Sequence, residues 1–322
     1  MLIANPKTYK GQELENIFFR PSFCGTSAEE LGIRVIYNMP MPTTVQVWSH
    51  SEHVLQPFAS GWNGGNNTIR QQKTIDMQKV KAESAFSAED YFSMVFEKIT
   101  NSADVNLGDL TGTELEKAET ELFRKAIAEG VRATMWLGDT NSELSLFSTF
   151  NGFFHAIKKY IDAGEEIYST SYDLENPISS RTKAHAECLT MASNELRSLR
   201  SEGHLAYFVS SDIYNQYLAD LDEKGCDSAY IDSINGHSTL LYHGIPIFEV
   251  ALDKYDKEAF SSFCLLTARR NLVLALNTSD MPENEVRMWY NPDEMENRQR
   301  ATFLAGTEVI DPRLVSIIYT VY

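Results

Sequence analysis

The feature that most constrains the fold is one long amphipathic helix in the middle of the chain. Thr113 and Glu116 form a capping box, in which a hydroxyl and a carboxylate satisfy the first free amides of a helix. Apolar side chains then recur at helical spacing as far as Leu137, and Gly138 follows. The apolar stripe consists of Leu115, Ala118, Leu122, Ala126, Ala133 and Leu137, widened by Phe123, Ile127 and Val131. A helix over residues 113–137 is about 37 Å long, the width of a domain.

The segment before this helix predicts a hairpin with little core of its own. Residues 43–49 and 69–79 alternate between apolar and polar side chains, as strands do. Between them lies a stretch rich in Gly and Asn, ASGWNGGNN, which suits a flexible tip. Most side chains are polar on both faces, and an isolated two-stranded ribbon is only marginally stable in water. We therefore expect residues 43–82 to form an extended hairpin that leans on another chain.

Residues 1–42 predict an irregular, extended arm. Prolines at positions 6, 21, 40 and 42 interrupt any regular element. Phe18, Phe19 and Phe23 are isolated apolar side chains within this arm. We expect the arm to pack against its surroundings through these few rings.

The rest of the chain predicts a mixture of helices and strands that does not alternate as βαβ units. A helix beginning at Ser87 and further helices over 145–165, 181–202 and 211–221 are indicated by caps and periodicity. Strands are indicated over 205–210, 240–252, 271–276, 286–290, 301–306 and 314–320. This order indicates the α+β class.

Composition excludes several classes of protein. The 322 residues are 43% hydrophobic and 11% aromatic, which excludes a disordered chain, and no run approaches the length of a membrane-spanning helix. With 45 acidic and 28 basic residues the net charge is -17, a poor basis for gripping nucleic acid. The first residues carry no secretory signal, so we expect the protein to be cytoplasmic at synthesis.

A search for reactive constellations finds none. The four cysteines lie too far apart in sequence for a local metal or redox pair, and we expect reduced, structural thiols. His185 and Glu187 match half of a zinc-deaminase signature, but the P-C-x-x-C half is absent. His50 with His53 suits neither a metal motif nor one face of a strand. We predict no catalytic residues, no cofactor, no metal and no enzyme activity, although catalytic residues scattered along the sequence stay an alternative.

Several strings, in this order, resemble the major capsid proteins of tailed bacteriophages, which have the Hong Kong 97-type fold. ELFRKAIAEGVRATMWLGDT (121–140) and FNGFFHAI (150–157) resemble the family's long spine helix and the turn after it. AYFVSSDIYNQYLADL (206–221) resembles its strand-then-helix entry to the axial domain. EVRMWYNPDEMENRQRATFLAGTEVIDP (285–312) resembles its closing strands. The resemblance covers roughly residues 40–322.

The resemblance implies a division of the chain. Residues 1–42 would be the N-terminal arm and 43–82 the extended hairpin loop. Residues 83–204 and 276–322 would form the peripheral domain with the spine helix 113–137, and 205–275 the axial domain. Arm and hairpin would lie on neighbouring subunits, with Trp62, Phe18, Phe19 and Phe23 as candidate inter-subunit contacts. Packing of these rings within one subunit is the alternative.

The resemblance also implies a function. The protein would be a major capsid protein, assembled in the host bacterial cytoplasm into the pentamers and hexamers of an icosahedral virion capsid. The shell would enclose double-stranded DNA without sequence-specific binding, and the acidic balance suits such a non-adhesive container. A portal and a separate scaffolding protein would be partners, and no membrane is involved. The alternatives are an encapsulin-type nanocompartment shell protein and a cytosolic enzyme with an unrecognised site.

Overall fold

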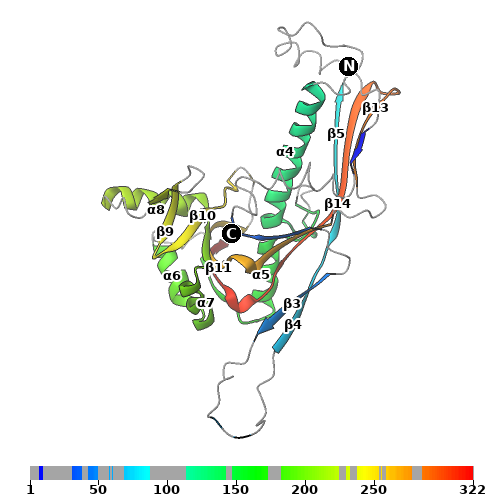
Figure 1. The fold of residues 1–322 in the computed structure, drawn as a ribbon. Helices are drawn as coiled ribbons and strands as arrows, with labels where there is room; N and C mark the ends of the chain where they lie inside the picture. Colours follow the sequence, from blue (N-terminus) through cyan, green and yellow to red (C-terminus); the bar gives the residue numbers. More distant parts are fainter. Residues whose placement is uncertain are drawn as a thin grey trace.

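The computed structural model describes residues 7–9, 31–37, 43–49, 58, 60, 69–87, 114–142, 147–172, 183–224, 230–232, 238–253, 255, 259–277 and 285–321. Within these residues the chain forms two β-sheets, a separate two-stranded ribbon and helices that cover the sheets. Figure 1 shows a long helix beside one sheet, a lobe of shorter helices around the other, and the ribbon projecting below both. The structure is thus mixed α and β, as the order of elements predicts.

The first sheet has six strands in the order β1-β13-β14-β12-β2, with β5 also paired to β14. β14 organises this sheet, because β13 and then β12 pair along one of its edges while β5 pairs along the other. The strands are β1 (Lys7–Tyr9), β2 (Arg34–Tyr37), β5 (Gln78–Ser87), β12 (Leu272–Asn277), β13 (Glu285–Asn291) and β14 (Glu296–Val309).

The second sheet has seven strands in the order β6-β15-β11-β7-β10-β9-β8. They are β6 (Tyr168–Tyr172), β7 (Leu205–Val209), β8 (Tyr230–Asp232), β9 (Ser238–Tyr242), β10 (Ile245–Glu249), β11 (Ala259–Ala268) and β15 (Val315–Val321). The ribbon consists of β3 (Thr43–Ser49) and β4 (Ile69–Ile75).

The described helices are α4 (Glu114–Leu137), α5 (Phe153–Asp162), α6 (Ala184–Met191), α7 (Asn194–Ser198) and α8 (Ser211–Lys224). Short 3-10 turns lie at Leu199–Glu202, Arg269–Asn271 and Pro312–Leu314. Among the described residues, no helix is both long enough and apolar enough to cross a membrane.

The long helix is present as expected, but it buries only part of the expected stripe. Ala133 and the widening residues Phe123, Ile127 and Val131 are buried, whereas Leu122 is 63% exposed. The expectation that Leu122 and Ala126 belong to the buried stripe is therefore wrong. Placing a phenylalanine and two branched side chains inside buries more apolar area than placing a leucine and an alanine there.

The end of α4 meets the start of α5 at two glycines. The Gly138 amide donates to the Thr134 carbonyl, and the Gly152 amide donates to the Gly138 carbonyl, each at 2.7 Å. A Cβ on Gly152 would lie 2.7 Å from the Thr134 oxygen, and one on Gly138 would lie 2.1 Å from the Phe150 oxygen. Residues 147–152 are used for this crossing, so the helix predicted over 145–165 begins only at Phe153.

Trp136, near the end of α4, lies beside this crossing and is fully buried. Its ring contacts Phe153 and Phe154 of α5 and Phe208 of β7, with ring centroids 5.2, 5.6 and 5.7 Å apart. The seven-stranded sheet therefore packs against α4 and α5 through one aromatic cluster, which forms part of the main core.

The seven-stranded sheet is buried on both faces. Along β7, Ala206 and Phe208 point into the core shared with α4 and α5, while Leu205, Tyr207 and Val209 point into a second core under α6 and α8. This explains why β7 is an unbroken apolar run rather than an alternating one.

Two predicted elements are divided by turns. The helix predicted over 181–202 breaks before α7, where the Ser193 hydroxyl accepts the Leu196 amide at 2.9 Å and donates to the Arg313 carbonyl at 3.0 Å. The apolar stretch 240–252 forms two strands, β9 and β10, joined at His243 and Gly244 with φ of 50° and 81°. Two successive residues with positive φ are typical of a tight hairpin turn.

The described parts of residues 1–42 are not an independent arm. β1 pairs with β13 and β2 pairs in parallel with β12, so both belong to the chain's own first sheet. Ser87, predicted to cap a helix, is the last residue of β5, and the remainder of that predicted helix lies outside the described residues. Neither strand is evident from its three or four residues alone, because their pairing partners lie far away in the sequence.

His185, on α6, is fully buried in the second core. The rings of Tyr207, Tyr217 and Tyr242 surround it, with centroids 5.2, 4.9 and 5.5 Å from the imidazole. Neither ring nitrogen has a hydrogen-bond partner among the described residues. Burial disfavours the cation and lowers the pKa of His185 from 6.5 to about 4.

Substituting Gly152 by alanine should destabilise the subunit. The new methyl group would meet only backbone atoms, at 2.7–2.8 Å, and these cannot move aside cheaply. We expect Gly152→Ala to lower the free energy of unfolding by about 1–3 kcal/mol in denaturant titrations. Gly130→Ala, on α4 with open space around it, is the matched control and should be neutral or stabilising. Equal stability of Gly152→Ala and the unmodified chain would contradict this account of the crossing.

The subunit should lose stability in acid partly through His185. The unfolded chain, with a His pKa near 6.5, binds the proton more readily than the folded chain, whose value is about 4. The contribution of His185 to the free energy of unfolding is therefore fully present above pH 6.5. It is lost as the pH falls through 4, and the full loss is about 3 kcal/mol. His185→Leu places a side chain that cannot bind a proton in this core. It should reduce the loss of unfolding free energy between pH 7 and 4.5 by about 2 kcal/mol. A variant that loses as much stability as the unmodified chain would show that His185 is not responsible.

Candidate assembly surfaces

The described residues contain no group of His, Cys, Asp or Glu side chains suited to hold a metal ion. The predicted candidates do not come together: His185 is buried among tyrosines, and His50 and His53 lie outside the described residues. Cys188 and Cys264 are buried free thiols, and the Cys188 thiol donates to the Cys264 carbonyl at 3.0 Å. Burial raises the pKa of the Cys264 thiol, which keeps it protonated and unreactive.

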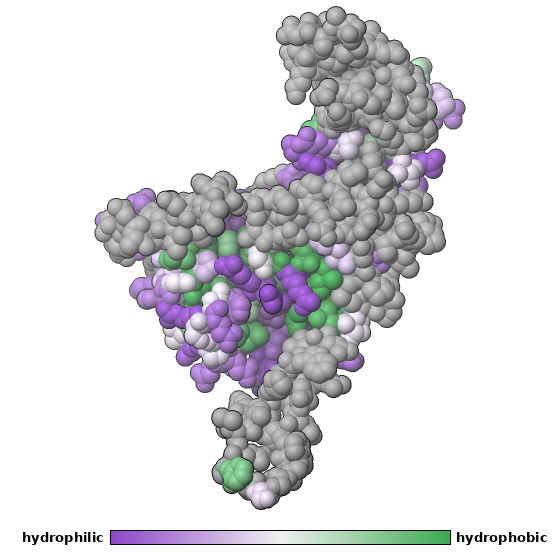
Figure 2. Space-filling model, viewed as in Figure 1, coloured by the Kyte–Doolittle hydropathy of each residue, from purple (hydrophilic) through white to green (hydrophobic). Residues whose placement is uncertain are grey.

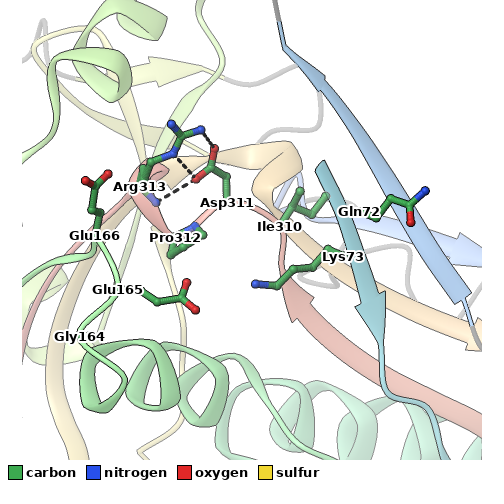
Figure 3. A pocket seen from close by; sticks show the side chains of 9 residues that line it. All are labelled: Gln72, Lys73, Gly164, Glu165, Glu166, Ile310, Asp311, Pro312 and Arg313. Atoms are coloured by element: carbon green, nitrogen blue, oxygen red, sulfur yellow. Dashed lines mark hydrogen bonds and ion pairs between the residues drawn. The ribbon is translucent and has the colours of Figure 1, made fainter. Parts of the chain in front are cut away.

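A cavity of about 500 Å³ lies where the β3–β4 ribbon joins the body. In Figure 3, the ammonium group of Lys73 and the carboxylate of Glu165 point toward each other across it. Arg313 closes one side through a two-pronged contact with Asp311 at 2.8 and 3.1 Å. The lining residues are Gln72, Lys73, Gly164, Glu165, Glu166, Ile310, Asp311, Pro312 and Arg313.

The contacts beside this cavity attach the ribbon to the body of the molecule. Lys73 lies 4.1 Å above the ring of Tyr160, whose hydroxyl donates to Glu308 at 2.5 Å. Burial and the Glu308 carboxylate raise the pKa of Tyr160, so its hydroxyl is a weaker acid than usual. Lys73, Tyr160 and Glu308 therefore link the ribbon to α5 and β14 by a cation–π contact and a charge-assisted hydrogen bond.

Contrary to expectation, the base of the ribbon is buried against the first sheet of its own chain. Val45, Ile75 and Met77 are buried with Val273, Ala275 and Leu304 of the first sheet. The backbone passes from β4 to β5 directly over Gly306, where a Cβ would lie 2.4 Å from the Asp76 oxygen. The ribbon is therefore fastened at its base, and the expected 43–82 hairpin is a β3–β4 pair followed by a strand of a different sheet.

Few residues beyond this base are described. Phe58, between β3 and β4, is fully exposed at 101% of its reference area. Trp62, Phe18, Phe19 and Phe23, the predicted contact residues, all lie outside the described residues. Phe58 lies in a segment of mixed polarity, so sequence reasoning passed over it.

The structure also exposes apolar groups that the sequence analysis did not place at the surface. Leu122 on α4 and Met295, in the turn between β13 and β14, are 63% and 68% exposed. Trp289 on β13 lies partly exposed between two arginines. On the face seen in Figure 2, green apolar groups lie beside purple hydrophilic ones over the central body above the ribbon.

Comparison with known proteins identifies the fold. No family model matches the sequence, and no curated protein matches it. A solved structure of the satellite phage P4 procapsid is similar over 92% of this chain and 97% of that chain, with TM-score 0.57 and 10% identity. A Gordonia phage Cozz structure matches over 92% of this chain and 86% of that chain, with TM-score 0.52 and 11% identity. An encapsulin complex from Synechococcus elongatus aligns with TM-score 0.46 and 10% identity over 89% of this chain and 84% of that chain. The chain therefore has the fold of phage major capsid proteins.

Proposed function

We propose that this protein is a major capsid protein that assembles into the icosahedral shell of a bacteriophage virion. The observation that supports this most is the likeness to a phage procapsid subunit, which spans nearly the whole of both chains. A match over 92% of this chain leaves little room for a separate catalytic domain. The protein is accordingly a structural subunit and not an enzyme.

The proposed subunit has the parts that a Hong Kong 97-type shell uses. α4 is the spine helix, residues 83–204 and 276–322 form the peripheral domain, and residues 205–275 form the axial domain. The ribbon extends beyond its buried base toward a neighbouring subunit, and Trp62, Phe18, Phe19 and Phe23 lie in contacts between copies. Pentamers and hexamers of this subunit enclose double-stranded DNA, with a portal and a separate scaffolding protein as partners in the host cytoplasm.

The net charge of -17 agrees with this role. DNA inside a shell is itself strongly anionic, and an acidic wall contains it without binding it tightly. High charge of one sign also keeps unassembled subunits soluble.

The proposal is tested by removing the part of the ribbon that has no described core. Residues 50–68 are replaced by Asn-Gly, which joins the paired residues Ser49 and Ile69 by a two-residue turn and leaves Val45 and Ile75 in place. We expect this variant to fold with the stability of the unmodified chain but to form no particles, as seen by negative-stain electron microscopy and light scattering. A matched control replaces Leu115, inside α4, by methionine and should assemble normally.

The contents of the particles separate the alternatives. The unmodified chain should form rings, shells or tubes of megadalton mass, and DNA inside them supports a virion. Protein cargo without DNA would identify an encapsulin-type compartment instead. Normal particles from the shortened variant would refute the role of the ribbon. Monomers or dimers as the sole species, even when the chain is produced with the proteins of neighbouring genes, would refute the shell.

A further inference from the structure

One face of the first sheet is left open by the described residues. The register places Arg287 opposite Arg300 and Trp289 opposite Arg298, so all four side chains project from the same face. The other face carries Val286, Met288 and Ala301, which are buried with α4. The open face therefore points away from the core.

This open face contains an electrostatic conflict. Arg287 and Arg300 are direct cross-strand neighbours, and like charges in such a pair repel. Both guanidinium groups lie near the Trp289 ring, at 5.7 and 5.9 Å from its centroid. Glu285 lies 3.7 Å from Arg300, but Arg287 is exposed and has no ion-pair partner among the described residues. In the register Arg300 also faces Glu83 of β5, so the charge left without an anion is that of Arg287. Arg287, Trp289 and Arg300 are here named the Arg–Trp face.

The turn between β13 and β14 carries the opposite properties. Asp293 is exposed, and its carboxylate has no ion-pair partner among the described residues, whereas Glu294 is engaged by Arg298. Met295 holds a positive φ of 54° with its side chain 68% exposed. A residue other than glycine in this region costs energy, and such strain is retained where the exposed conformation has a use. Residues 292–295, here named the acidic turn, thus present one free carboxylate and one thioether.

In its own subunit the acidic turn reaches only the near end of this face, where Glu294 is engaged by Arg298. Arg287 lies four residues before Asn291, the last residue of β13, and this distance is about 13 Å along a strand. Among the described residues no carboxylate is ion-paired with Arg287, which leaves its charge available to another molecule.

We propose that the acidic turn of one subunit docks on the Arg–Trp face of a second copy of this chain. Asp293 then lies between Arg287 and Arg300 of the second copy, and Met295 lies against its Trp289. The carboxylate resolves the repulsion between the two arginines, and a thioether against an aromatic ring is a favourable contact. Because different surfaces of the two copies meet, repetition of the contact builds a ring where its rotation closes and an open filament where it does not.

This inference rests on the proposed function, because a shell requires such repeated contacts. It is tested by charge reversal in the full chain. Arg287→Glu and Asp293→Lys should each lower the assembled fraction by about tenfold or more, since like charges then meet. The double variant Arg287→Glu/Asp293→Lys restores opposite charges between copies and should recover assembly. Lys158→Glu, a charge reversal at an exposed position of α5, is the control and should assemble as the unmodified chain does.

Misfolding is separated from loss of contact by the melting temperature. Arg287→Glu removes the repulsion with Arg300 inside the subunit, so its melting temperature should be equal to or above that of the unmodified chain. Normal assembly of Arg287→Glu, or failure of the double variant to recover assembly while it remains folded, would overturn the inference.

A chemical test detects the contact between two copies whether or not shells form. In Arg287→Lys, a carbodiimide should join the Asp293 carboxylate of one copy to the lysine introduced at position 287 of another as an amide. Mass spectrometry of a mixture of isotope-labelled and unlabelled chains detects this bond between copies. If the unmodified chain forms no shells even when it is produced with the proteins of neighbouring genes, the proposed function fails, and the coupling at high protein concentration still decides the contact. Absence of the coupled peptide would overturn the inference.

Discussion

The fold depends on the close crossing of α4 and α5 at Gly138 and Gly152. Two short hydrogen bonds, each 2.7 Å, run through these glycines, and any larger side chain would meet backbone atoms. The crossing holds Trp136 over the seven-stranded sheet, where it contacts rings from α5, β7 and β11. The relative placement of the long helix and both sheets follows from this one contact, because the main core includes residues from all three.

The two sheets on either side of this crossing differ in how much of their surface is buried. The seven-stranded sheet is covered on both faces by two cores, one of which it shares with α4, α5 and the first sheet. Among the described residues, the first sheet buries one face against α4 and leaves the other uncovered, and its long strand β14 also supports the base of the ribbon through Leu304 and Gly306. The surfaces free to meet other molecules therefore belong mainly to the first sheet and the ribbon, while the lobe supplies stability.

The sequence predicted helices and strands better than it predicted which of them pack or pair together. α4, β7, α8 and the last three strands were recognised because caps, periodicity and apolar runs are local signals. The buried stripe of α4 was misjudged, since the choice between Leu122 and Phe123 is made by the sheet and not by the helix. The strands β1 and β2 were missed, because three or four residues become a strand only through pairing with β13 and β12. The predicted contact residues fall outside the described part of the chain, and the Arg–Trp face required knowledge of cross-strand register.

Charge sets the remaining constraint on a protein of this kind. Each copy carries a net charge of -17, so copies repel one another at long range, although salt reduces this repulsion beyond about 10 Å. Attraction must then come from short-range contacts that match a local excess of positive charge with a local excess of negative charge. The hairpin of β13 and β14 carries both, with arginines on its open face and a free carboxylate in its turn. A subunit that is acidic overall but internally complementary at one hairpin can stay soluble alone and still associate in one defined orientation.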